Sequence, residues 1–258
     1  MNQKVTTGQA SMAGWILLCK QLHELLELPD PTAFGELRLQ AAELLRGMPA
    51  GDEATRFQLE LQLLDIFAAL YLCSPHDARQ AWKLLDEGCA RLSVSTPNLL
   101  AATARVRYIA ALQMLQAGLI ARGSIDPLAI RRELVLEDGP DSLLLDAMLT
   151  EALLRRDHAL AMHACCLARS FENKPEGAFG LRFRQLSLAL LEQRGTADQL
   201  AELLGSASTY ADWQRIDGAI WQLCLEADLI PLENWHRHLE AHERCHDWIY
   251  REIARLGS

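Results

Sequence analysis

Three histidines late in the chain have a spacing that could hold a metal ion. The segment 242–246 reads HERCH and fits the pattern H-E-x-x-H, and His238 lies four residues before His242. Histidines four residues apart lie on one face of a helix, where both can bind one Zn²⁺ while the glutamate acts as a general base. One hypothesis is therefore a zinc-dependent hydrolase with His238, His242 and His246 as metal ligands and Glu243 as the catalytic base.

This pattern is similar to that of the zincin metallopeptidases. The resemblance implies that His242 and His246 bind zinc and that Glu243 is the base. Arg244 places a cation inside the motif, where that family usually has an uncharged residue. We therefore favour a second interpretation, in which this segment is the solvated face of a helix over 231–256 and holds no cofactor. The apolar edge of that helix is formed by Trp235, Leu239, Trp248 and Ile249.

Four other side chains are candidates for contacts with another protein. Arg105 and Tyr108 lie one helical turn apart, and Arg182 and Arg184 lie close together later in the chain. Arginine and tyrosine are enriched among the residues that contribute most to protein–protein binding. We expect all four to be exposed, with an ordinary solubilising role as the alternative. The sequence contains no GxGxxG, GxxxxGK[ST] or GxSxG motif, so we lean toward a protein without catalytic activity.

Charge and cysteine content limit the possible partners and the compartment. The chain has 34 acidic and 25 basic residues and a net charge of -9, which disfavours binding to nucleic acid or to anionic membranes. Only four of the basic residues are lysines, a bias compatible with a GC-rich bacterial genome. The seven cysteines form no CxxC pair and are predicted to be thiols in a reducing compartment. The apolar stretch 12–19 is too short to span a membrane, so we expect a cytoplasmic protein.

The composition predicts that these candidate residues stand on helices. Leucine and alanine together number 85, whereas valine and isoleucine number 15. Leucine and alanine lose little conformational freedom in a helix, while β-branched residues favour strands. The ratio therefore predicts an all-α protein.

Prolines and capping residues predict where the helices begin. Pairs such as Ser74-Pro75 and Asp126-Pro127 place a side-chain oxygen directly before a proline at the first helical position. We expect one domain over 1–258, with 1–10 frayed and a possible subdivision near 122–126. Short connections predict antiparallel hairpins of neighbouring helices. The expected helices are 10–28, 31–47, 52–73, 75–93, 97–121, 127–137, 140–155, 157–172, 176–194, 197–205, 209–227 and 231–256.

Two segments of the chain share a spacing of small and apolar residues. The interval between them is 80 residues, which would correspond to two helical hairpins of roughly 40 residues each. Small residues at the ends of the pattern allow another helix to approach closely. The two segments are Asp77-x3-Ala81-x3-Leu85-x2-Gly88 and Asp157-x3-Ala161-x3-Cys165-x2-Ala168.

This pattern resembles the second helix of a tetratricopeptide (TPR) repeat, and the segment 156–161 resembles the turn and start of such a helix. The resemblance covers about 52–93 and 140–172. It implies antiparallel helical hairpins stacked as an irregular TPR-like α-solenoid. It also implies a non-enzymatic protein–protein interaction module, such as an adaptor, chaperone or regulator. The positions that line the concave groove in that family are mostly apolar here: Leu63, Ile66, Leu70, Leu143, Leu153 and Leu154.

Three functions therefore remain open at the level of the sequence. The favoured one is binding of another protein, whose identity the residues do not specify. The first alternative is a zinc-dependent metallohydrolase or peptidase that uses the segment 242–246. The second is an all-α sensor that binds a small ligand in an apolar pocket between hairpins. The oligomeric state also remains open.

Overall fold

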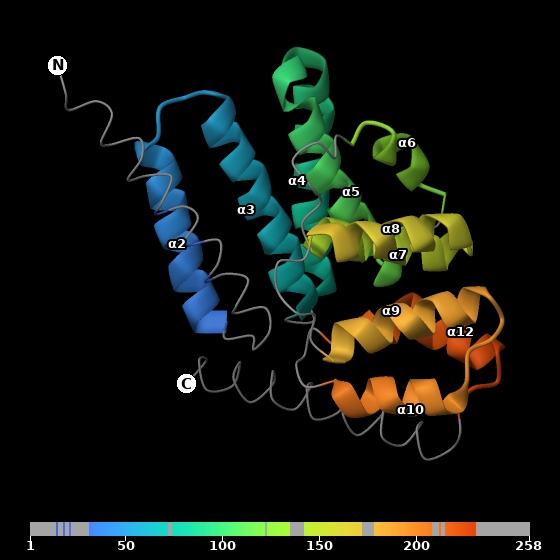
Figure 1. The fold of residues 1–258 in the computed structure, drawn as a ribbon. Helices are drawn as coiled ribbons and strands as arrows, with labels where there is room; N and C mark the ends of the chain where they lie inside the picture. The colour runs from blue at the N-terminus through green and yellow to red at the C-terminus, as the bar shows by residue number, and fades with distance from the viewer. Residues whose placement is uncertain are drawn as a thin grey trace. The chain divides into compact units, whose positions relative to one another are not determined.

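The computed structural model shows a protein built from helices (Figure 1). It describes residues 14, 18, 21, 31–71, 74–121, 123–134, 142–171, 178–207, 212 and 215–230. No strand occurs within these ranges. The prediction of an all-helical fold is therefore confirmed for the described residues, as expected from their high content of leucine and alanine.

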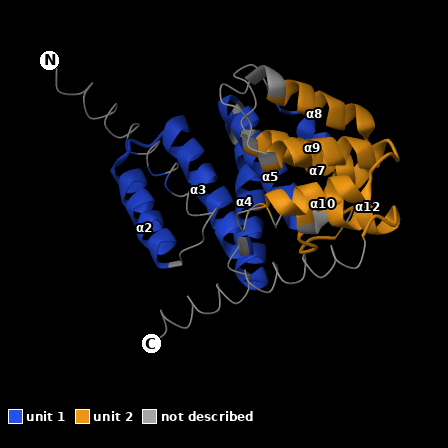
Figure 2. Cartoon of the chain, turned by 60° about the horizontal axis from the view of Figure 1, so that its bottom comes forward, with its two compact units in different colours: residues 1–114, 128–134, 249–258 blue, residues 115–127, 135–248 orange. Residues whose placement is uncertain are grey.

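The helices form two compact units, coloured separately in Figure 2. Unit 1 contains the described residues up to Met114 together with Leu128–Leu134. Unit 2 contains Leu115–Pro127 and the described residues from 142 onward. The chain passes from the first unit to the second inside helix α5, and each unit is considered separately below. The expectation of a single domain stays a prediction.

Unit 1 is organised around helix α3. Helices α2 (Pro31–Gly47) and α4 (Pro75–Ser95) both pack on α3 (Asp52–Tyr71). Because the connection between α3 and α4 is short, these two helices form an antiparallel hairpin. The chain then makes a short 3₁₀ turn, Pro97–Leu99, before α5 (Leu100–Gln116).

Helix α3 is buried on more of its surface than an amphipathic stripe requires. Leu59, Leu63 and Ile66, which recur at helical spacing, are all buried, and Leu70 is half-buried. Several residues outside this stripe are buried as well: Leu61, Leu64, Phe67, Ala68 and Ala69. Burial on several faces means that α3 is a central helix, for which a single apolar stripe is not expected. Because Leu63 and Ile66 are buried, they do not line an open groove.

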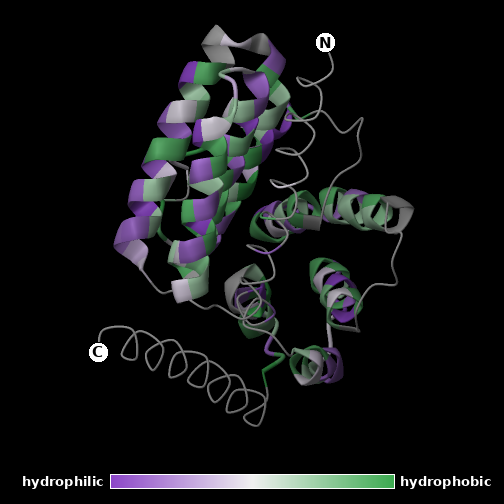
Figure 3. Cartoon of the chain, turned by 90° about the vertical axis from the view of Figure 1, so that its left-hand side faces the viewer, coloured by the Kyte–Doolittle hydropathy of each residue, from purple (hydrophilic) through white to green (hydrophobic). Residues whose placement is uncertain are grey.

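Unit 2 contains two further hairpins. Helix α7 (Ser142–Arg155) pairs with α8 (His158–Phe171), and α9 (Ala178–Leu191) pairs with α10 (Ala197–Ser206). Helix α8 also packs on α9. A π-helical segment, Ile216–Ile220, contacts α7 and continues directly into α12 (Trp221–Glu226). Hydrophobic and hydrophilic residues are both found along the helices of the described part of the chain, as the colouring of Figure 3 displays.

Most of the predicted helix starts agree with the structure. Helices α2, α4 and α6 (Pro127–Arg131) begin at the expected prolines. Helix α8 begins after Asp157, whose Oδ1 accepts a hydrogen bond from the backbone N–H of Leu160 at 3.0 Å. Ser74 precedes α4 but does not cap its backbone, because its hydroxyl is hydrogen-bonded to the Asp77 carboxylate.

Two predicted helix ends are wrong. The helix expected over 97–121 ends at Gln116, and Gly118 has a φ of +67°, a left-handed conformation that stops a helix and suits glycine. The helix expected over 127–137 ends at Arg131. There the backbone N–H groups of Glu133 and Leu134 bond three residues back instead of four, which closes the helix with a tight turn.

Candidate interaction surface

The expectation that Tyr108 is exposed is wrong. Its exposed fraction is 0%, and it lies on the part of α5 where most residues from Thr103 to Met114 are buried. Arg105 on the same helix is not an open surface residue either. Its Nη1 donates a hydrogen bond to Oε1 of Glu60 on α3 at 2.6 Å, and only 24% of its side chain is exposed. In unit 1, Arg105 therefore connects α5 to α3.

The other two predicted contact residues, Arg182 and Arg184, are partly exposed on α9 in unit 2. The Arg182 guanidinium donates to the backbone carbonyl oxygen of Glu202 on α10 at 3.3 Å, and Nε lies 3.8 Å from the Glu202 carboxylate. This contact holds Arg182 against α10 while 38% of its side chain remains exposed. Leu181, next to Arg182, is 46% exposed.

The sequence of α9 explains why this surface faces outward. Phe179, Phe183, Leu186 and Leu190 recur at helical spacing and are all buried. Residues out of phase with that stripe must lie on the opposite side of the helix. We define the α9 outer face as Leu181, Arg182, Arg184 and Gln185. The exposure of Leu181 was not predicted from the sequence. It could have been, because Leu181 is out of phase with the buried stripe.

The buried side of α9 is fixed to other elements of unit 2 by Arg215. The Arg215 guanidinium carbon lies 4.5 Å from the ring centroid of Phe183 and 5.2 Å from that of Phe179. Its Nη2 also donates to Oδ1 of Asp146 on α7 at 2.7 Å. A cation over two aromatic faces, paired with a carboxylate, attaches the start of the π-helical segment to α7 and α9. The side of α9 opposite its outer face is thereby attached to α7 and to the start of the π-helical segment.

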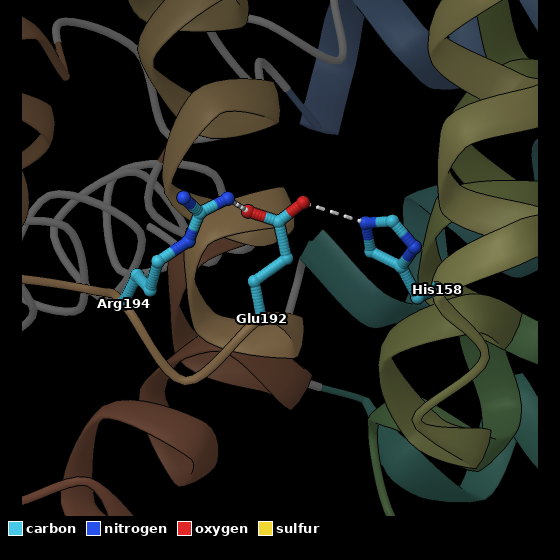
Figure 4. Close-up of polar contacts among 3 residues, drawn as sticks. All are labelled: His158, Glu192 and Arg194. Carbon is cyan, nitrogen blue, oxygen red and sulfur yellow. Dashed lines mark hydrogen bonds and ion pairs between the residues drawn. The ribbon is translucent and has the colours of Figure 1, made fainter.

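A group of charged side chains connects α8 to the end of α9 (Figure 4). Glu192 Oε1 lies 2.9 Å from Nε2 of His158, the first residue of α8, and Glu192 Oε2 accepts a hydrogen bond from Arg194. These contacts lower the pKa of Glu192, the hydrogen bond from Arg194 contributing most. A separate ion pair joins Arg156 to Glu226 at the end of α12. Every acid in this group has a basic partner, so its arrangement is that of a structural connection between helices.

The predicted zinc-binding residues His238, His242 and His246 lie outside the described residues, as does Glu243. Within the described ranges, histidine, cysteine, aspartate and glutamate form no group of three or more that could hold a metal ion. None of the described helices is both long and apolar enough to cross a membrane. Comparison with protein-family models, curated proteins and solved structures finds no match to this chain.

Proposed function

We propose that this protein is a non-enzymatic interaction module that binds another protein through the α9 outer face. The observation that carries the proposal is the exposure of Leu181 on α9, beside Arg182 and Arg184, which are partly exposed. The other side of the same helix is buried. A large apolar side chain in water gains free energy when a partner covers it. Arginine adds hydrogen bonds and apolar contact at the same surface.

Preorganisation supports the same assignment. The contact of Arg182 with Glu202 restricts the arginine before a partner arrives, so less side-chain entropy is lost on binding. The attachment of α9 through Phe179, Phe183 and Arg215 keeps the backbone of this face in place. Proteins built from stacked helical hairpins bind partners on extended surfaces, and we assign this role to the α9 outer face.

Within this class, the resemblance to tetratricopeptide repeats favours an irregular TPR-like solenoid that acts as an adaptor, chaperone or regulator. The α3–α4 and α7–α8 hairpins, which carry the resemblance, support this assignment. No disulfide joins Cys89, Cys165, Cys166 and Cys224 in the described part of the chain, which supports a reducing compartment, so we propose that the protein is cytoplasmic.

The test is an affinity capture from the host that compares three matched forms of the protein. Leu181→Glu introduces a charge on the α9 outer face, whereas Leu84→Glu introduces the same charge at an equally apolar, exposed position of unit 1. We expect the unaltered chain and Leu84→Glu to retain one common partner at similar yield, and Leu181→Glu to lose it. Circular dichroism and thermal unfolding verify that both variants are folded.

Recovery of the same proteins by all three forms would contradict the proposed surface. Recovery of none above background would remove support for an interaction module. The zinc hydrolase remains the alternative, and metal analysis of untagged protein separates it from the proposal. Stoichiometric zinc that disappears in His242→Ala and His246→Ala would favour that alternative.

A further inference from the structure

Arg182 on the α9 outer face has a looser contact with its carboxylate neighbour than three arginines of unit 1 have with theirs. Arg38, Arg105 and Arg107 each place a guanidinium nitrogen 2.5–2.6 Å from a carboxylate oxygen on a neighbouring helix. The Nε of Arg182 lies 3.8 Å from Oε2 of Glu202, which is longer than a hydrogen bond. The Glu202 carboxylate is therefore close enough to attract Arg182 without forming a hydrogen bond to it.

The guanidinium of Arg182 is oriented by the main chain and keeps donors for another acceptor. A guanidinium carries several N–H donors in a planar fork. In the described part of the chain, Arg182 donates one hydrogen bond, from Nη1 to the main-chain carbonyl oxygen of Glu202 at 3.3 Å. The side chains of Arg182 and Glu202 are 38% and 65% exposed, so a partner can reach both of them.

The charge of α9 is positive, in contrast to that of the whole chain. The helix contains two arginines and no acidic residue, whereas the chain has a net charge of -9. Opposite charge directs an approaching group to its site and disfavours partners of the wrong sign. An acidic group is therefore attracted to α9 more than to most of this protein.

We propose that the partner of the α9 outer face is an acidic protein segment whose aspartate or glutamate carboxylate replaces that of Glu202 at Arg182. An apolar side chain of the same segment covers Leu181, which is 46% exposed. This inference rests on the proposed function, because it names the chemistry of the partner bound there. A carboxylate that accepts hydrogen bonds from the guanidinium fork binds more strongly than an exposed ion pair without them. Glu202 then acts as an internal competitor for Arg182.

The experiment measures the affinity of the full chain for three synthetic amphipathic peptides by fluorescence anisotropy. The peptides share one pattern of leucines and differ in the residues that border it, which are glutamates, glutamines or lysines. The leucines are the apolar contact for Leu181, and the bordering residues are the variable contact for Arg182. The glutamate peptide should bind most tightly and the lysine peptide most weakly.

Substitution of the two paired residues should change the affinity for the glutamate peptide in opposite directions. Arg182→Gln removes the cation and should weaken binding by about fivefold or more, the usual effect of losing an important interface residue. Glu202→Gln removes the competing carboxylate but keeps the main-chain oxygen that orients Arg182. It should tighten binding by about two- to fivefold, the range expected for an exposed ion pair. Glu202→Gln should leave the affinity for the glutamine peptide unchanged.

Glu87→Gln on α4 is the matched control for the change in net charge. Glu87 belongs to another exposed ion pair, in which its Oε1 lies 3.9 Å from Nζ of Lys83. Its substitution removes the same charge as Glu202→Gln and should leave the affinity for all three peptides unchanged. Equal tightening by Glu87→Gln and Glu202→Gln would show general charge repulsion instead of competition at Arg182, and would overturn the proposal.

Other results would also overturn the acidic partner: equal affinity for the glutamate and glutamine peptides, no binding of any peptide, or weaker binding of the glutamate peptide by Glu202→Gln. None of these results bears on the α9 outer face itself, which the capture with Leu181→Glu tests separately. If Leu181→Glu loses the captured partner and Arg182→Gln retains it, the proposed function stands and the acidic partner is rejected.

Discussion

Gly195, between α9 and α10, lies close to the side chains of two leucines. A Cβ placed there would lie 2.9 Å from Cδ2 of Leu190 and 3.0 Å from Cδ1 of Leu229. Both distances are shorter than van der Waals contact, and both atoms are terminal methyl groups of flexible leucine side chains. A methyl group at this position therefore requires the two leucine side chains to shift by a few tenths of an ångström.

We predict that Gly195→Ala lowers the free energy of unfolding by about 1 kcal/mol, the low end of the cost of an added methyl group in a packed site, because the two leucine side chains must shift to admit it. Gly205→Ala is the control, because a Cβ there meets no atom within 4 Å and the residue lies in α10. That substitution should stabilise the protein by about 0.5–1 kcal/mol through helix propensity. Urea denaturation measures both values, and equal effects of the two substitutions would refute this account of Gly195.

The charge on Glu192, a single residue, predicts that the stability of the protein depends on pH. Its pKa is lowered in the folded protein by the hydrogen bonds from Arg194 and His158. A carboxylate with a depressed folded pKa contributes stability above its unfolded pKa of about 4.3, and this contribution is lost as the pH falls through the folded value.

Glu192→Gln should therefore lower the thermal midpoint at pH 7 and 6, and its difference from the unaltered chain should shrink as the pH falls below about 4. Thermal unfolding followed by circular dichroism across this range gives the comparison. A difference that stays constant down to pH 2 would mean that the charge of Glu192 contributes nothing.

Three helices of unit 2 end in the same way. Arg156, Gln193 and Asp228 have φ values of 56°, 56° and 54°. After each one, the next backbone N–H bonds five residues back: Asp157 to Ala152, Arg194 to Ala189, and Leu229 to Cys224. This is the Schellman arrangement, in which glycine usually occupies the left-handed position.

A side chain at a left-handed position carries a steric cost, so glycine should be better there. We predict that Gln193→Gly raises the free energy of unfolding by about 0.5–1 kcal/mol, the steric gain less the entropy that glycine loses on folding. The same change inside α9, Gln185→Gly, should destabilise by about 1 kcal/mol. Opposite signs in chemical denaturation are the expected result; a loss of stability at both positions would argue against a Schellman end at Gln193.

For the whole molecule, the division into two compact units predicts that each unit unfolds locally without the other. Local unfolding follows groups of residues that pack together. Leu85→Ala removes a side chain of unit 1 that is fully buried, and Gly195→Ala disturbs unit 2.

In hydrogen exchange followed by mass spectrometry, Leu85→Ala should accelerate exchange mainly in peptides from α3 and α4. Gly195→Ala should accelerate it mainly in peptides from α9 and α10. Large-to-small core substitutions cost about 2–5 kcal/mol, enough to be visible in exchange rates. Uniform acceleration across all helices by either variant would show that the chain opens as one cooperative unit.

Local chemistry accounts for the features that could be predicted from residues alone. The prolines at 31, 75 and 127 mark helix starts because the missing N–H costs nothing at the first turn. The capping box of α10 was also readable: the Thr196 hydroxyl accepts from the Gln199 N–H while the Gln199 side chain accepts from the Thr196 N–H. We did not predict it, although Thr-x-x-Gln is its ordinary signature.

The amino-acid sequence by itself determined the helical class and most helix starts, because these depend on propensity and spacing within a few residues. Only the tertiary structure decided that Tyr108 lies in the core, that α3 is buried on several faces, and that Arg105 and Arg182 are held by Glu60 and Glu202. Burial and ion pairing depend on residues distant in the chain, and no local spacing specifies which of them will meet.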